Sequence, residues 1–348
     1  MSCTIQDIAR ELNLSTATVS RSLKQNARIA ATTRAKVAEA AARMGYQGRS
    51  RRITTQTTSQ QFKVAVLLSS ASHKDSPNTL RELQGIQSQA DDMGMAVEVD
   101  YAVDYRHQPY TEADLAQRQA MLDHLQKERH HAALLLGRHD PTFVAALRQQ
   151  FVPVIALGWK YPNVEHDLVS SNNMTDYALA TQKLAELGHT RITYVDECYK
   201  ASFHDQRHAG FLQGCCSAGL AISEQHFFSA DGYDDRGNIR DDAIDALLAQ
   251  GTTACACAND RVAYLLLDAF AKRSISVPDQ MSIIGYDGMQ PVGQSQLRLA
   301  TMSQDFMEQG RACVSLAHRR ITQPSSSNWS VSINGHWSAG QTIAPPCR

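Results

Sequence analysis

The sequence lacks the segments and cysteine patterns that mark several classes of protein. Its 348 residues contain no run of 18 apolar residues, and the chain does not open with a secretory signal. The eight cysteines form no Cys-x-x-Cys pair, so buried free thiols explain them better than a metal or redox site. These absences predict a cytoplasmic protein that does not enter a membrane.

Sequence motifs of common enzymes are also missing. The chain has no Gly-x-Ser-x-Gly motif, no Walker loop and no metal-type cluster of Cys and His. His204 and His208 have the i, i+4 spacing of a helical metal pair, but no Glu follows His204 as in a zinc protease, and His189 is better explained by packing. The sequence therefore predicts no catalytic residue, no metal and no cofactor, which makes an enzyme the weakest alternative.

Charge is distributed unevenly along the chain. The first 60 residues carry ten Lys and Arg but only three acids, a net charge of +7, which leaves −8 for the remaining 288 residues. A basic end on an acidic body suggests a polyanionic partner for that end. A solvated basic tail would give the same count, so the pattern of the segment has to decide.

The first 45 residues have the spacing of three short helices. Thr4 can cap the first helix, Ser15 can cap the second, and Gly45 ends a third that begins near Thr33. Apolar residues at helical spacing supply the inner faces: Ile5, Ile8, Ala9, Leu12, Val19, Leu23, Val37, Ala41 and Met44. Two short helices joined by a tight turn and braced by a third form a helix-turn-helix unit. A small helical protein-interaction module would show the same helices, but the basic charge favours DNA.

The second helix of such a unit lies in the major groove of double-stranded DNA. Arg21 is predicted to pair with guanine, and Thr16 and Ala17 to make hydroxyl or methyl contacts with bases. The basic residues outside this helix are better placed to bind phosphates, which position the protein without reading sequence. The predicted DNA-binding residues are Thr4, Ser15, Thr16, Ala17, Thr18, Ser20, Arg21, Lys24, Arg28, Arg34 and Arg49.

These residues also match a known pattern with several parts at fixed spacing. Thr4-Ile5-Gln6-Asp7-Ile8-Ala9, Leu14-Ser15-x-x-Thr18-Val19-Ser20-Arg21-x-Leu23, Thr33-Arg34-x-Lys36-Val37 and Gly45-Tyr46 resemble the headpiece of the LacI/GalR family of bacterial transcription regulators. The resemblance implies that positions 16, 17 and 21 read bases. It also implies a repressor that acts as a homodimer on a roughly palindromic operator.

Residues 49–61 have the polar composition of a linker and depart from the family pattern. Family members usually carry an Asn-x-x-Ala-Arg-x-Leu hinge helix here, whose Leu enters the minor groove. This chain has Gly48-Arg49 where Pro-Asn is usual, and Thr55 or Gln56 where the Leu is expected. An unstructured tether and an arginine-rich minor-groove contact both remain open.

From Phe62 onward, short apolar runs alternate with helical patterns. Strands are predicted at 62–68, 95–99, 132–136, 152–157, 192–196, 227–230, 254–258 and 281–286, and helices at 80–93, 113–128, 142–150, 175–187, 205–218, 238–250 and 261–273. This alternation predicts parallel α/β sheets with crossover helices. Because about 285 residues are too many for one sheet, we expect two lobes with a ligand between them.

Polar side chains follow several of these strands and suit a polyhydroxylated ligand, since polar groups pair with hydroxyls and an aromatic face covers C–H surface. Each residue also has a local explanation: Asn259 as a helix cap, Asp287 as a turn residue and Trp159 as part of the core. The predicted ligand-binding residues are Ser72, His73, Trp159, Arg207, Asn259, Asp287 and Gln304.

The resemblance extends through the body. Arg207-x-x-Gly210-Phe211, Ala258-Asn259-Asp260 and Val277-Pro278-Asp279-x-Met281-Ser282-Ile283-Ile284-Gly285-Tyr286-Asp287 are similar to landmarks of the same family. They imply a type I periplasmic-binding-protein-like body that binds a sugar or nucleobase between its lobes, held by Arg207, Asn259 and Asp287, with Gln304 carried over from the segment where the chain returns between lobes.

Two departures accompany that match. An Asp-Asn pair usual near the lobe crossing reads Ser171-Asn172, and a Pro-aromatic-aromatic segment reads Pro77-Asn78-Thr79, so Trp159 is the alternative aromatic wall. The predicted organisation is an all-α headpiece at 1–48, a linker at 49–61 and a two-lobed effector-binding and dimerisation domain at 62–348. A sugar-binding protein without a DNA function is the second alternative.

Overall fold

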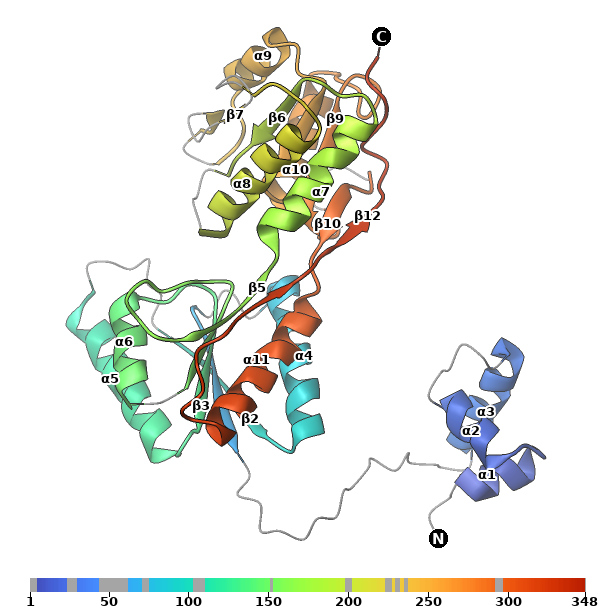
Figure 1. The fold of residues 1–348 in the computed structure, drawn as a ribbon, viewed down its shortest axis with the longest axis vertical. Coiled ribbons are helices and arrows are strands. Elements are labelled where there is room, and N and C mark those ends of the chain that lie inside the picture. Colours follow the sequence, from blue (N-terminus) through green and yellow to red (C-terminus); the bar gives the residue numbers. More distant parts are fainter. Residues whose placement is uncertain are drawn as a thin grey trace. The chain divides into compact units, whose positions relative to one another are not determined.

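The chain forms two compact units, Met1–Gln60 and Gln61–Arg348 (Figure 1). The computed structural model describes residues 5–23, 30–43, 62–70, 75–102, 110–150, 153–197, 202–222, 227–228, 232–234, 237–291 and 297–347. The proposed linker at 49–61 lies outside these residues, so its conformation stays a prediction. Within the described part, no helix is long and apolar enough to span a bilayer.

The first unit contains the three expected helices, α1 (Ile5–Glu11), α2 (Thr16–Leu23) and α3 (Ala31–Arg43). Ser15 caps α2 as predicted, because its Oγ accepts a hydrogen bond from the Thr18 backbone N–H at 3.1 Å. The helices bury a small shared core of Ile8, Ala9, Val19, Val37, Ala40 and Ala41. The short turn between α1 and α2 and the brace from α3 are those of a helix-turn-helix unit.

The first lobe of the body is a six-stranded parallel sheet in the order β11-β5-β4-β3-β1-β2. Its strands are β1 (Lys63–Leu68), β2 (Ala96–Tyr101), β3 (Ala132–Leu136), β4 (Val154–Leu157), β5 (Asp167–Ser171) and β11 (Ser330–Ile333). Helices α4 (Pro77–Met93) and α11 (Phe306–Thr322) cover one face, and α5 (Glu112–Lys127) and α6 (Pro141–Gln150) cover the other (Figure 1). Successive residues of β1 enter opposite cores, so the strand is apolar throughout, as in sheets buried on both faces.

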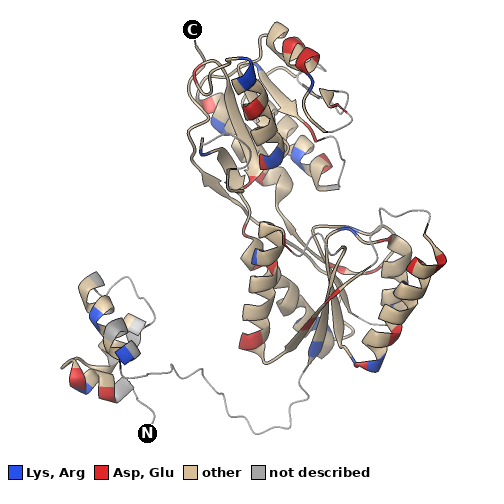
Figure 2. Cartoon of the chain, turned by 180° about the vertical axis from the view of Figure 1, so that it is seen from behind, with Lys and Arg blue, Asp and Glu red and all other residues tan. Residues whose placement is uncertain are grey.

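The second lobe repeats this plan in the order β12-β10-β9-β8-β6-β7, with β12 antiparallel to β10. Its strands are β6 (Ile192–Val195), β7 (Phe227–Phe228), β8 (Ala254–Cys257), β9 (Ser282–Asp287), β10 (Ala300–Ser303) and β12 (His336–Ser338). Its helices are α7 (Asn173–Glu186), α8 (Ser202–Ser217), α9 (Asp241–Ala249) and α10 (Asp260–Lys272). In both lobes the charged residues lie mainly on the helices and loops rather than in the sheets (Figure 2).

The chain passes between the lobes three times: from β5 to α7, from β10 to α11, and from β11 to β12. Two lobes of parallel α/β structure confirm the predicted fold class. The strands β5, β10 and β11 and the helix α11 were not predicted, and all four belong to the segments around these passages.

His189 and the cysteines of the body were predicted to be packing and buried residues. His189 is a packing residue, because its ring bonds to Thr253 Oγ1 at 2.9 Å and to the carbonyl of Ala344 at 2.9 Å, which holds the C-terminal segment against the second lobe. Four of the described cysteines are buried, but Cys216 and Cys347 are exposed, so the expectation of burial is wrong for these two.

Candidate functional site

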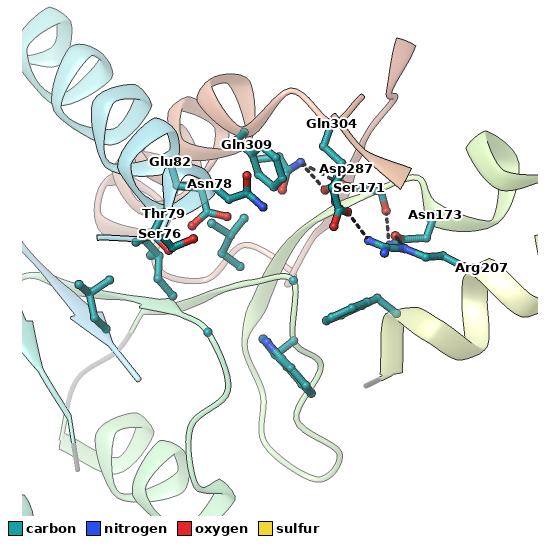
Figure 3. A pocket seen from close by; sticks show the side chains of 18 residues that line it. Ser76, Asn78, Thr79, Glu82, Ser171, Asn173, Arg207, Asp287, Gln304 and Gln309 are labelled. Atoms are coloured by element: carbon teal, nitrogen blue, oxygen red, sulfur yellow. Dashed lines mark hydrogen bonds and ion pairs between the residues drawn. The ribbon is translucent and has the colours of Figure 1, made fainter. Parts of the chain in front are cut away.

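A cavity of about 260 Å³ lies between the two lobes of the body (Figure 3). It opens where strands β1, β3, β4, β5 and β9 end and where helices α4 and α11 begin. Carboxyl ends of parallel strands are the usual ligand sites of such sheets. Ten of its 18 lining residues have polar side chains: Ser76, Asn78, Thr79, Glu82, Ser171, Asn173, Arg207, Asp287, Gln304 and Gln309.

Arg207 of α8 is the central cation of the cavity, and its side chain is only 4% exposed. Its Nε donates to Asn173 Oδ1 at 2.9 Å, and its two terminal nitrogens donate to the Ala258 carbonyl at 2.8 Å and to Asp287 Oδ1 at 3.0 Å. The guanidinium also lies 4.0 Å from the ring centroid of Tyr286. Burial lowers the pKa of Arg207, but the Asp287 carboxylate and the surrounding tyrosines together raise it by more, so the group stays charged.

Asp287 continues this network toward the first lobe. Burial raises its pKa despite the opposing charge of Arg207 and the hydrogen bond from Gln304. Gln304 Nε2 donates to Asp287 Oδ1 at 2.6 Å, while Gln304 Oε1 accepts from Ser171 Oγ and, at 3.1 Å, from Gln309 Nε2. Ser171 ends β5 and Gln309 belongs to α11, so this chain of hydrogen bonds joins the two lobes across the cavity (Figure 3).

Aromatic side chains provide a wall of the cavity. Trp159 follows β4, and Phe203 lies on α8. Their rings meet edge to face with centroids 5.4 Å apart. Asn78 and Thr79 stand where an aromatic segment was expected and provide no aromatic face. Trp159, which was predicted as the alternative aromatic wall, does line the cavity.

Most of the predicted ligand-binding residues that the structure describes come together. Trp159, Arg207, Asp287 and Gln304 all line the cavity. Asn259 does not: it caps α10, with its Oδ1 accepting from the Val262 N–H at 2.9 Å and its Nδ2 donating to Glu197 at 2.7 Å. The local explanation of Asn259 is thus the one that the structure supports. Ser72 and His73 lie outside the described residues.

Replacing Asn259 by alanine is expected to lower the free energy of unfolding by about 0.5–2 kcal/mol, because a helix loses its cap. Effector affinity is expected to change little, since the side chain is not among the cavity residues. Chemical denaturation and calorimetric titration would measure the two effects separately. A large loss of affinity at unchanged stability would restore Asn259 to the binding site.

Several cavity residues on helices were not predicted from the sequence. Glu82 of α4, Phe203 of α8 and Gln309 of α11 all line the cavity. Glu82 sits inside a predicted helix whose pattern indicates only packing, Phe203 precedes the helix predicted at 205–218, and the helix that carries Gln309 was not predicted. Asn78 and Thr79 could have been identified from the sequence, because they replace an aromatic segment expected after the first strand. Asn173 follows the altered Ser171-Asn172 pair and was not assigned a role.

The predicted base-reading residues lie on α2 as expected, but few of their side chains are described. Thr16 is exposed and Thr18 is half-buried. For Ala17, Ser20, Arg21 and Arg34 the structure describes the helical backbone only, and Thr4, Lys24, Arg28 and Arg49 lie outside the described residues. Positions 17 and 21 are four residues apart and lie on the side of α2 away from the buried Val19, which is where a DNA-contacting face has to be.

A helix-turn-helix unit at one end and a two-lobed body with a polar cleft define a DNA-binding protein with a ligand-binding domain. Residues 4–48 match the model of the bacterial regulatory proteins of the lacI family, and residues 181–343 match that of the periplasmic binding protein-like domain. The chain belongs to the LacI/GalR family of transcription regulators, a family of regulators rather than enzymes.

Individual relatives agree with this assignment. The ribose operon repressor of Escherichia coli (strain K12) is 25% identical over 325 residues, which cover 92% of this chain and 94% of the repressor. A complex of the transcriptional regulator CelR with cellobiose has a TM-score of 0.64 at 20% identity, covering 98% of this chain and 99% of that one. The lac repressor dimer bound to operator and an anti-inducer has a TM-score of 0.61 at 20% identity, covering 99% and 100%.

Proposed function

We propose that this regulator is a repressor whose operator affinity is controlled by a sugar or sugar derivative bound in the interlobe cavity. The observation that carries the proposal is the hydrogen-bond chain from Arg207 through Asp287 and Gln304 to Ser171, which spans both lobes inside a polar cavity. Such a set of donors and acceptors, with an aromatic wall beside it, is suited to ligand hydroxyls and a C–H face. The CelR relative bound to cellobiose is consistent with a sugar.

The same chain of hydrogen bonds suggests how the ligand acts. A sugar hydroxyl that bonds to Asp287 or Gln304 competes with bonds that now join the lobes. The ligand therefore favours one degree of lobe closure over another, by the difference in its affinity for the two states. Operator affinity changes with the degree of lobe closure if the two headpieces of a dimer are held differently in the two states.

We further propose double-stranded operator DNA and a second copy of the chain as partners, and the cytoplasm as the place where they meet. The lac repressor relative is a dimer on its operator. In this chain, Leu80 of α4 and Met307 of α11 are 46% and 39% exposed on two helices that pack together, and exposed apolar side chains are typical of an interface. Predicted base contacts come from α2 of each headpiece, Arg21 above all.

A gel-shift comparison tests the headpiece and the body together. The full chain is expected to retard fragments of its own upstream region, and a chain that begins at residue 62 is expected not to. A sugar that raises the melting temperature of both proteins is expected to change the shift of the full chain alone. Equal shifts by both chains would contradict the DNA-reader assignment and favour a sugar-binding protein with an adventitious basic end.

A further inference from the structure

Glu82 is the one lining residue with an ionisable side chain for which no described partner is found. It lies on α4, on the opposite side of the cavity from Arg207 and its partners (Figure 3). The backbone around it is held firmly, because α4 and α11 pack so closely that a Cβ on Gly310 would lie 2.2 Å from the Glu82 carbonyl oxygen. Its carboxyl is therefore presented to the cavity by a rigid helix.

The charges in the cavity are unbalanced around this group. Three of the described lining residues have an acidic or basic side chain: Arg207, Asp287 and Glu82. Arg207 is already paired with Asp287 at 3.0 Å and donates its remaining described bonds to Asn173 and Ala258. A second carboxyl, on the half-buried Glu82, thus faces the cavity without a described cation, although withdrawing a carboxylate from water is costly unless a cation or hydrogen-bond donors satisfy it.

We propose that the effector is an amino sugar, whose hydroxyls bond to the Arg207–Asp287–Gln304 network while its ammonium group binds the Glu82 carboxylate. This inference rests on the proposed function, because it names the class of effector that the same cavity takes. Ser76, Asn78 and Thr79, on the first turn of α4 and just before it, offer further acceptors on the Glu82 side of the cavity. A volume of about 260 Å³ suits a molecule of monosaccharide size, since drug-sized ligands occupy roughly 300–1,000 Å³.

The protonation of Glu82 gives this contact a measurable signature. Burial raises the pKa of Glu82 to about 8, so in the empty protein at neutral pH the carboxyl is mostly protonated. The titratable groups near it are the buried Cys313 thiol of α11 and, across the cavity, Arg207 and Asp287. An ammonium group lowers the pKa of the carboxyl in the complex. Binding therefore releases a proton at neutral pH, and affinity rises as the pH is raised toward about 8 for as long as the amine stays charged.

The test uses the full chain, 2-amino-2-deoxyhexoses and the matching neutral hexoses as probes, in calorimetric titrations with buffers of different ionisation enthalpy. We expect an amino sugar to bind more tightly than its neutral counterpart and to release a proton. The isosteric variant Glu82→Gln is expected to weaken amino-sugar binding by about 10- to 100-fold and to abolish proton release. Glu112→Gln, which alters an exposed carboxyl on α5, is the matched control and is expected to leave both unchanged.

The possible results separate this inference from the function on which it rests. If neutral sugars bind as well as amino sugars, or if Glu82→Gln binds the amino sugar with unchanged affinity, the amino-sugar inference is wrong and the sugar-controlled regulator stands. If no sugar of either kind binds, both are wrong. Thermal denaturation of Glu82→Gln shows whether its fold is intact, and Glu82→Asp, which keeps the charge, is expected to retain proton release even if it binds less tightly.

Discussion

Replacement of Arg207 by alanine is expected to abolish the response to the effector and to lower the free energy of unfolding of the body by about 3–5 kcal/mol. The guanidinium is 4% exposed and holds Asp287, Asn173 and the Ala258 carbonyl together at the cavity wall. Without it, the Asp287 carboxylate loses its cation in a site where burial already raises its pKa. Titration with a sugar that raises the melting temperature of the full chain measures the first effect, and denaturant unfolding measures the second.

A double variant distinguishes loss of binding from loss of the fold. Arg207→Met combined with Asp287→Asn removes both charges, and replacing a buried ion pair by uncharged groups often costs little stability. We expect this variant to recover most of the stability lost in Arg207→Ala while remaining unresponsive to the effector. Arg191→Ala, an exposed arginine of the same lobe, is expected to change stability by less than about 0.5 kcal/mol. Effector binding retained by the double variant would remove Arg207 from the site.

The sequence predicted the sheets well because most of their strands are local apolar runs. A run such as β3, with the residues Ala-Ala-Leu-Leu-Leu, is buried along its whole length and carries its own signal. The strand β5 has only Leu168 and Val169 as apolar residues, and it is held by pairing with β4 on one side and with the distant β11 on the other. Such a strand depends on partners far away in the sequence, which a local pattern does not contain.

The cavity shows the same division between local and distant information. Trp159 and Asp287 could be predicted because they lie at the ends of strands, and the carboxyl ends of parallel strands meet at one edge of a sheet. Glu82 and Gln309 could not, because only the packing of α4 against α11 decides which face of each helix meets the cavity. Asn259 was ambiguous for a different reason: an amide at a strand end can cap the next helix as readily as it can hold a ligand.

Replacement of Arg21 by alanine is expected to remove specific operator binding while leaving the effector titration unchanged. A bidentate arginine–guanine contact contributes about 1–3 kcal/mol of discrimination, and a homodimer would lose one in each half-site, so operator affinity is expected to fall by roughly 30-fold or more. Position 21 lies on the side of α2 away from Val19, which is fully buried, so the core of the headpiece is not expected to change. Gel shifts with operator and with unrelated DNA would measure the specific and the non-specific DNA affinity.

A charge-matched variant shows whether the loss comes from base recognition or from charge alone. Arg10→Ala removes one positive charge from α1, where the side chain is 82% exposed and lies 3.7 Å from Asp7. If the contribution is purely electrostatic, both substitutions weaken DNA binding equally, for operator and for unrelated DNA, and change its salt dependence by the same amount. Base recognition predicts instead that Arg21→Ala alone loses the difference between operator and unrelated DNA. If the two variants behave identically, α2 does not read the operator through position 21, and the specificity of this headpiece has to come from other residues.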